Sequence, residues 1–136
     1  MRTALVVDDS MLIRHMVCRF LEERGYAVES ASNGVEALEA LRTMEPSLIV
    51  SDMIMPKMDG CELIARLKAE PKWETIPLVV LTGRASSGEP QPEQADYIVH
   101  KDKDISAQLE RTLDSILRKQ QEQDAANQAQ VDAVQA

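Results

Sequence analysis

The residues best suited to chemistry in this chain are three aspartates, a threonine and a lysine, each near the end of a short apolar run. They are Asp8, Asp9, Asp52, Thr82 and Lys101. In an open parallel sheet the carboxyl ends of the strands meet at one edge, where ligands bind. A single acidic residue after a strand is commonly a helix cap. Capping does not explain the whole set, so we expect the five side chains to converge on one crevice.

The chemistry of this set suits a divalent cation and a phosphoryl group. Three close carboxylates repel one another and do not all stay ionised without a cation, and a site of oxygen ligands alone favours Mg²⁺. An aspartate can itself be the nucleophile that forms an acyl phosphate. A threonine hydroxyl and a lysine ammonium can each bind a phosphoryl oxygen. The residues therefore predict Mg²⁺-assisted phosphorylation of an aspartate.

Short strands and amphipathic helices alternate along the chain and must position these residues. The predicted strands are Ala4–Val7, Ala27–Ala31, Leu48–Val50, Leu78–Leu81 and Tyr97–Val99. Near-continuous apolar strands between helices indicate a parallel sheet covered on both faces. With right-handed crossovers, the fold class is a doubly wound five-stranded α/β domain.

The helices are predicted from apolar residues at spacings of three and four. The first begins near Met11, is capped by Asp8 or Ser10, includes Leu12 in its buried face and stops at Gly25. The second runs from Gly34 and is ended by Pro46. The third ends near Pro71, and the last uses apolar residues from Ile105 to Leu117.

Two segments depart from this alternation. Between Arg84 and Asp96, Gly88, Pro90 and Pro92 disfavour a helix, so we expect a loop or a single turn in place of a fourth crossover helix. After Lys119 the chain is rich in Gln and Ala and poor in large apolar side chains. We therefore divide it into a domain over residues 1–119 and a polar tail over 120–136 that extends the last helix or is a disordered linker.

Composition argues against several classes of partner. The chain carries 15 basic and 23 acidic residues, a net charge of −8, so we expect no direct contact with nucleic acid. No apolar run approaches the ~20 residues that cross a bilayer, and no signal peptide is evident, so we expect a cytoplasmic protein. Cys18 and Cys61 are predicted to be buried thiols, not a disulfide. His15 and His100 are expected to have no role in the site.

Several segments, taken in order, resemble the motifs of bacterial response-regulator receivers, the CheY-like family. They are Leu5–Ser10 (LVVDDS), Asn33–Leu38 (NGVEAL), Ser51–Gly60 (SDMIMPKMDG), Val79–Gly83 (VVLTG) and Lys101. The resemblance covers about residues 3–118. It implies a flavodoxin-like sheet with strand order 2-1-3-4-5.

The resemblance also implies a role for each residue of the set. Asp52 would be the phosphoacceptor. Asp9 and Asp52 would bind Mg²⁺ directly, together with the backbone carbonyl of Ile54, and Asp8 would help mainly through water. Thr82 and Lys101 would sense and stabilise the phosphoryl group. Such domains accept phosphate from a phosphohistidine on a sensor histidine kinase or a phosphotransfer protein.

The chain departs from the family near its last strand. Thr82 and Lys101 are 19 positions apart, a few fewer than is usual in the family. The aromatic switch residue of the family lies three positions before the lysine, where this chain has Ile98. The adjacent Tyr97 is our switch candidate, although the offset turns its side chain to the other face unless a bulge intervenes. Asp102 is expected to cap the last helix.

We therefore expect a phosphorylation-switched binding module that is not an enzyme. It would act on a downstream protein as a stand-alone receiver, or on an output domain as part of a larger regulator. A constitutive scaffold with the receiver fold is one alternative, favoured by the altered fourth crossover. A Mg²⁺-dependent phosphatase with an aspartyl nucleophile is another, but that chemistry would need a second aspartate where Ile54 stands.

Overall fold

The structure is a computed structural model of the 136-residue chain, and it describes residues 2–53, 60–83, 95–101 and 104–135. Five strands form one parallel sheet in the order β2-β1-β3-β4-β5. The strands are β1 (Arg2–Val7), β2 (Tyr26–Ala31), β3 (Leu48–Asp52), β4 (Leu78–Thr82) and β5 (Tyr97–His100). The predicted fold class and strand order are confirmed.

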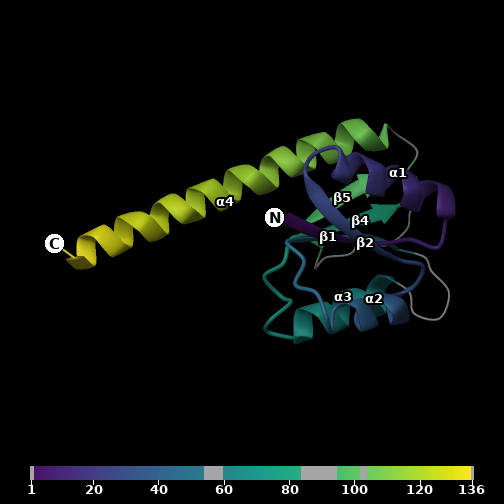
Figure 1. The fold of residues 1–136 in the computed structure, drawn as a ribbon, viewed down its shortest axis with the longest axis horizontal. Coiled ribbons are helices and arrows are strands. Elements are labelled where there is room, and N and C mark those ends of the chain that lie inside the picture. The colour runs from purple at the N-terminus through teal and green to yellow at the C-terminus, as the bar shows by residue number, and fades with distance from the viewer. Residues whose placement is uncertain (1, 54–59, 84–94, 102–103, 136) are drawn as a thin grey trace.

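The helices form a layer on each face of the sheet (Figure 1). α1 (Met11–Glu22) and α4 (Ile105–Gln135) lie on one side, and α2 (Gly34–Ala40) and α3 (Gly60–Ala69) lie on the other. These four are the helices of the described residues. The segment 84–94, for which we expect a loop in place of a further crossover helix, lies outside them, so that expectation stays a prediction.

The sheet separates two apolar clusters, and β1 contributes to both. Ala4 and Val6 pack on the side of α1 and α4, whereas Leu5 and Val7 pack on the side of α2 and α3. All four are fully buried. Because helices cover both faces, a central strand of this sheet is apolar at successive positions, which is the pattern that made the strands predictable.

The first helix starts and stops where the sequence predicts. The Ser10 hydroxyl oxygen caps α1 by accepting a hydrogen bond from the Ile13 backbone N–H at 3.3 Å. Gly25, with φ of 91°, ends the turn that follows, in a conformation that side chains disfavour. The prediction that Leu12 is buried is wrong, because its side chain is 76% exposed.

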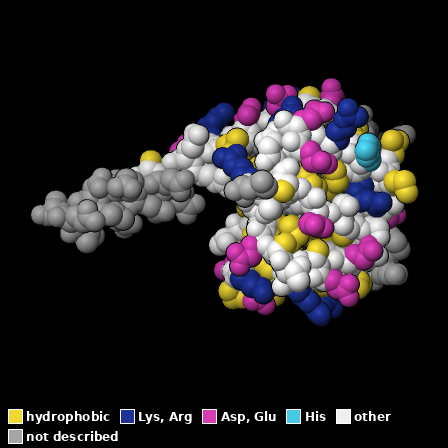
Figure 2. All heavy atoms as spheres, viewed as in Figure 1, with side chains coloured by type: hydrophobic (Ala, Val, Ile, Leu, Met, Phe, Trp, Pro, Cys, Tyr) yellow, Lys and Arg dark blue, Asp and Glu magenta, His cyan; other side chains and the backbone are white. Residues whose placement is uncertain are grey.

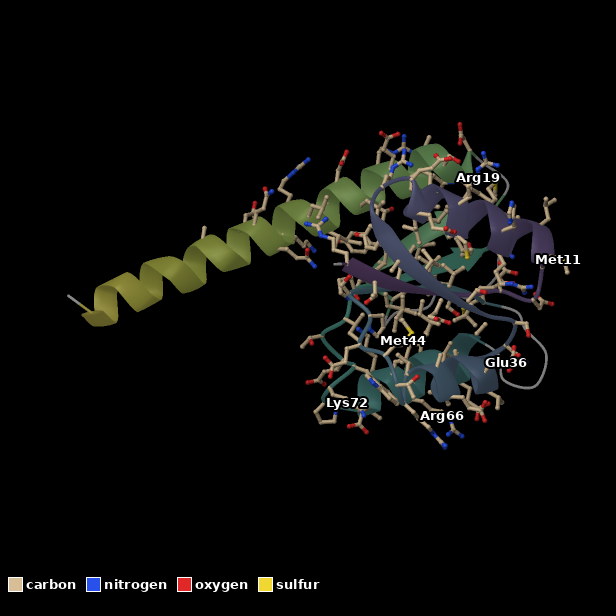
Figure 3. All side chains as sticks on the ribbon, in the orientation of Figure 1. Met11, Arg19, Glu36, Met44, Arg66 and Lys72 are labelled. Carbon is tan, nitrogen blue, oxygen red and sulfur yellow. The ribbon has the colours of Figure 1, made fainter. Side chains whose placement is uncertain are left out.

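Leu12 is exposed because it lies off the buried stripe of α1. That stripe is centred on Val17 and Leu21, and a residue five positions before Val17 is rotated by ~140° around the helix from it. Figure 3 shows the neighbouring Met11 at the outer edge of the molecule, whereas Met44 lies inward, among side chains below the sheet.

The last helix is longer than the domain it covers. α4 runs for 31 residues through Gln135, so the segment after Lys119 continues as helix. In Figure 1 its far end projects from the body on the side opposite to the arrowheads of β4 and β5. Because the helix begins at Ile105, its cap is Asp104, whose Oδ1 accepts a hydrogen bond from the Ala107 backbone N–H at 3.0 Å. Asp102, which we expected to cap this helix, lies outside the described residues.

Two smaller expectations also need correction. α2 ends at Ala40, well before Pro46, and Leu41 is its C-cap. Cys61 is exposed on the first turn of α3 and not buried, while Cys18 is partly buried, and both are free thiols.

The surface carries both signs of charge. Figure 2 shows acidic and basic side chains mixed over the face in view. Within the part of the chain that the structure describes, no helix is both long enough and apolar enough to cross a membrane.

Candidate functional site

The predicted residues converge at the carboxyl edge of the sheet. Asp8, Asp9 and Asp52 each offer a carboxylate oxygen, and these oxygens lie within 4.8 Å of one another. Lys101 Nζ lies 2.9 Å from Asp52 Oδ1 and 3.5 Å from Asp8 Oδ2. Thr82 ends β4, directly after the residue that pairs with Asp52. Four different strands therefore supply one group of side chains.

The turn from β1 into α1 fixes the orientation of Asp8. Its side chain is fully buried, and Oδ1 accepts a hydrogen bond from the Ser10 backbone N–H at 2.8 Å. Its backbone carbonyl accepts a hydrogen bond from Arg14 Nη1 at 2.7 Å. Asp9, the next residue, is exposed. The pair thus presents one buried and one solvent-facing carboxylate.

Asp52 is nearly buried, with 5% of its surface exposed. Its Oδ1 accepts a hydrogen bond from the Met53 backbone N–H at 2.8 Å and contacts Lys101 Nζ at 2.9 Å. Both contacts use the same oxygen. The carboxylate is therefore held in one orientation by two donors.

Electrostatics in the cluster favour added positive charge. Burial raises the pKa of Asp8 from 3.8 to about 6, opposed by the Ser10 backbone N–H and assisted by the negative charge of Asp52. Burial lowers the pKa of Lys101, but its hydrogen bond to Asp52 and the charges of Asp52 and Asp8 outweigh this, so the net pKa is raised. Lys101 thus remains an ammonium group beside the two buried aspartates.

The donor set fits a hard divalent cation. One ammonium charge offsets only part of the charge of three carboxylates. Asp8 Oδ2 is buried and accepts no hydrogen bond from the described residues, and its contact with Lys101 Nζ is long. Oxygen ligands of this kind suit Mg²⁺. Asp8, Asp9 and Asp52 are the described residues that could hold it, and Ile54, the predicted carbonyl ligand, lies outside them.

Tyr97 is not brought to the other site residues. It pairs with Val79 and packs in the cluster of α1 and α4, with Lys119 Nζ 5.5 Å from its ring centroid. Thr82 instead pairs with His100. Because Tyr97 and His100 are three positions apart on one strand, their side chains lie on opposite faces of the sheet.

His100 is the site residue that our sequence prediction missed. Its Nδ1 lies 3.1 Å from Thr82 Oγ1. The available signal was its position beside Lys101 at the end of a predicted strand. Choosing its face, however, required the register between β4 and β5.

Comparison with known proteins gives the same class as the fold and site. The family model of the response regulator receiver domain matches residues 4–129. The chain is 36% identical over 86 residues to the response regulator Rre1 of Synechocystis, covering 62% of this chain and 37% of that protein.

Solved receiver structures agree. The signal receiver domain of a signal transduction histidine kinase from Syntrophus aciditrophicus matches with a TM-score of 0.75 at 31% identity, covering 88% of this chain and 92% of that one. The response regulator TrrA of Thermotoga maritima, solved with Mg²⁺ and BeF, matches with a TM-score of 0.74 at 27% identity, covering 85% and 99% of the two chains.

The doubly wound sheet, with an acidic cluster and a lysine at its carboxyl edge, agrees with this family. This chain belongs to the response regulator receiver domain family. The matched segment spans between 36% and 62% of the length of the first curated relatives.

Proposed function

We propose that Asp52 accepts a phosphoryl group in a Mg²⁺-dependent reaction and that its phosphorylation switches the binding of a partner protein. The observation that carries this proposal is the nearly buried Asp52 carboxylate, held by Lys101 Nζ at 2.9 Å beside the Asp8 and Asp9 carboxylates. A surface aspartate that only improved solubility would need none of these neighbours.

The reaction follows from the position of the Asp52 oxygens. Oδ1 is engaged by Met53 and Lys101, so Oδ2 is the oxygen that we expect to attack phosphorus. An O–P bond forms and the N–P bond of a donor phosphohistidine breaks; with its other ring nitrogen protonated, the imidazole leaves as a neutral ring. The product is an acyl phosphate on Asp52.

The surrounding residues stabilise the added charge. Lys101 can move its ammonium from the carboxylate to a phosphoryl oxygen, and the Thr82 hydroxyl can donate to another. Asp8, Asp9 and Asp52 would hold Mg²⁺, which supplies positive charge to the transferring group when bound. The Mg²⁺ seen with the relative TrrA supports this assignment.

Membership of the receiver family supports two kinds of partner. A sensor histidine kinase or a histidine phosphotransfer protein would supply the phosphoryl group. A downstream protein, or an output domain of a longer regulator, would respond to it. We propose that the chain acts in the cytoplasm as a switch and not as an enzyme, because the phosphoryl group is received to change binding and not to make a released product.

Intact-mass analysis after incubation with acetyl phosphate tests the proposal. The wild-type protein is expected to gain one phosphoryl group when Mg²⁺ is present and none when it is chelated. Asp52→Asn removes the nucleophilic oxygen and is expected to gain none. Asp114→Asn, an exposed aspartate on α4, is the matched control and is expected to behave as wild type.

Three outcomes would contradict the proposal. Equal phosphorylation of Asp52→Asn would place the acceptor elsewhere. Failure of the folded wild type to gain mass with both acetyl phosphate and a phosphohistidine donor would favour a constitutive scaffold. Continuous release of inorganic phosphate from added phosphomonoesters, dependent on Asp52, would indicate a phosphatase.

A further inference from the structure

Thr82 has a hydrogen-bonding partner on the neighbouring strand. Thr82 and His100 are directly paired residues of β4 and β5, and Thr82 Oγ1 lies 3.1 Å from His100 Nδ1. Thr82 is buried and His100 is partly buried. The hydroxyl that could donate to a phosphoryl oxygen is therefore already held by an imidazole.

A hydroxyl group has only one proton to donate. If Thr82 donates it to a phosphoryl oxygen, it cannot also donate it to His100. The imidazole can accommodate the change, because Nδ1 accepts a hydrogen bond in one neutral tautomer and donates one in the other. The contact can thus persist with its direction reversed when Nε2 releases its proton to water and Nδ1 takes one from water.

We propose that His100 is the positioning residue for Thr82: its Nδ1 accepts a hydrogen bond from the Thr82 hydroxyl in the unphosphorylated domain and donates one to Thr82 Oγ1 after phosphorylation. The inference rests on the proposed phosphorylation of Asp52. Tyr97 cannot take this role from the opposite face of the sheet, and Ile98, on the same face as His100, has no polar side-chain atom.

The backbone of His100 joins this pair to the last helix. Gln108, in the first turn of α4, accepts a hydrogen bond from the His100 backbone N–H at 2.9 Å and donates one to the His100 carbonyl at 2.8 Å. The Gln108 carbonyl in turn accepts a hydrogen bond from the Thr112 hydroxyl at 2.8 Å. A shift of His100 would therefore reach α4 through one side chain.

The end of β5 is also bonded to β4. The Lys101 backbone N–H donates to the Thr82 carbonyl at 2.9 Å, so the ends of β4 and β5 are joined directly. The backbone around His100 is thus bonded to both β4 and α4, and its imidazole contacts the Thr82 hydroxyl. The structure thus assigns His100 as the link between the phosphoryl-sensing hydroxyl and α4.

The direct test is the imidazole nitrogen NMR spectrum of the full chain, before and after addition of Mg²⁺ with beryllium fluoride as the phosphoryl stand-in. The His100 nitrogen shifts are expected to exchange the acceptor pattern at Nδ1 for the donor pattern. His15, exposed on α1, is the internal control and is expected to keep its pattern. An unchanged His100 pattern in a protein that binds beryllium fluoride would overturn the inference.

Two variants separate positioning from a merely structural role. His100→Asn keeps a polar group near the place of Nδ1 and is expected to preserve the shift changes that beryllium fluoride causes in the backbone amides of Gln108–Thr112. His100→Leu removes the hydrogen bond and is expected to lose most of those changes while still gaining a phosphoryl group on Asp52 from acetyl phosphate. Full retention of the changes in His100→Leu would overturn the inference.

The outcomes distinguish the two proposals. Phosphorylation of wild-type Asp52 with no response of His100 would leave the proposed function intact and sink the inference alone. Absence of any phosphoryl transfer to wild-type Asp52 would sink both. If His100→Leu does not fold, the wild-type imidazole spectrum still decides the question.

Discussion

Among the described residues, Asp8 is the carboxyl group whose environment opposes its charge most strongly. It is fully buried, and its pKa is raised from 3.8 to about 6. A carboxyl group with a raised pKa binds its proton more tightly in the folded state than in the unfolded state. Its contribution to stability is therefore complete below about pH 4 and is lost as the pH rises through about 6.

Asp8→Asn is consequently expected to stabilise the metal-free protein at neutral pH. The amide keeps the oxygen that accepts the Ser10 hydrogen bond and removes a buried charge. We expect a gain of about 1–3 kcal/mol in the free energy of unfolding near pH 7, shrinking toward zero near pH 4. Urea unfolding at several pH values, with EDTA present, measures it.

Asp114→Asn is the control, since this aspartate is exposed. A gain for Asp8→Asn that did not depend on pH would show that charge burial is not its cause. With Mg²⁺ present the wild type is expected to recover stability that the variant does not, because the variant has lost one of the three carboxylates.

At the scale of the elements, the two ends of α1 contribute differently to the stability of the domain. Leu21 is fully buried in the core, whereas Leu12 is 76% exposed. Leu21→Ala is expected to cost about 2–5 kcal/mol of stability, because it leaves a cavity in a packed core. Leu12→Ala is expected to change stability by about 0.5 kcal/mol or less.

Chemical unfolding of the two variants compares the same substitution on the same helix. Similar costs at both positions would contradict the packing described here. The comparison also tests whether the first turn of α1, with Met11 and Leu12, contributes to the packed core.

How far the sequence predicted these elements depends on the kind of signal each one carries. The strands of the sheet interior could be predicted because both faces are buried, which makes runs such as Leu78–Leu81 apolar at every position. The cap at Ser10 and the stop at Gly25 carry local signals of their own. Leu12 could not be assigned, because apolar character alone does not tell whether a neighbouring element covers the first turn.

The candidate site also has a part that the sequence predicts and a part that it does not. The ends of the strands bring Asp8, Asp52 and Lys101 together in any sheet of this topology, so their contact followed from the order of elements. The partner of Thr82 did not, because it depends on the register between β4 and β5. A shift of one residue would have placed another side chain opposite Thr82.

At the scale of the whole molecule, α4 consists of a packed part and an overhanging part. Its last buried residue among those described is Ile116, and Gln121 and Glu122 are exposed. Deletion of residues 121–136 is therefore expected to leave the melting temperature and the phosphorylation of Asp52 unchanged. Calorimetry and intact-mass analysis of the truncated chain measure both.

Deletion of residues 113–136 is the contrasting truncation, because it extends into the packed part of α4. It removes Leu113 and Ile116, both buried in the cluster of α1 and α4, and is expected to abolish cooperative unfolding. A large loss of stability from the shorter deletion alone would show that the overhanging part contacts the domain.

The overhanging part of α4 also converts a small tilt of the helix into a larger displacement of its end. The residues from Gln121 to Gln135 extend the helix by about 22 Å at 1.5 Å per residue. A tilt of about 10° at the base of such a lever would carry its tip through about 4 Å, on the order of a side-chain length. Gln108, which holds His100, lies in the first turn of the same helix. An angular change too small to disturb the core would thus become a displacement that a partner could detect.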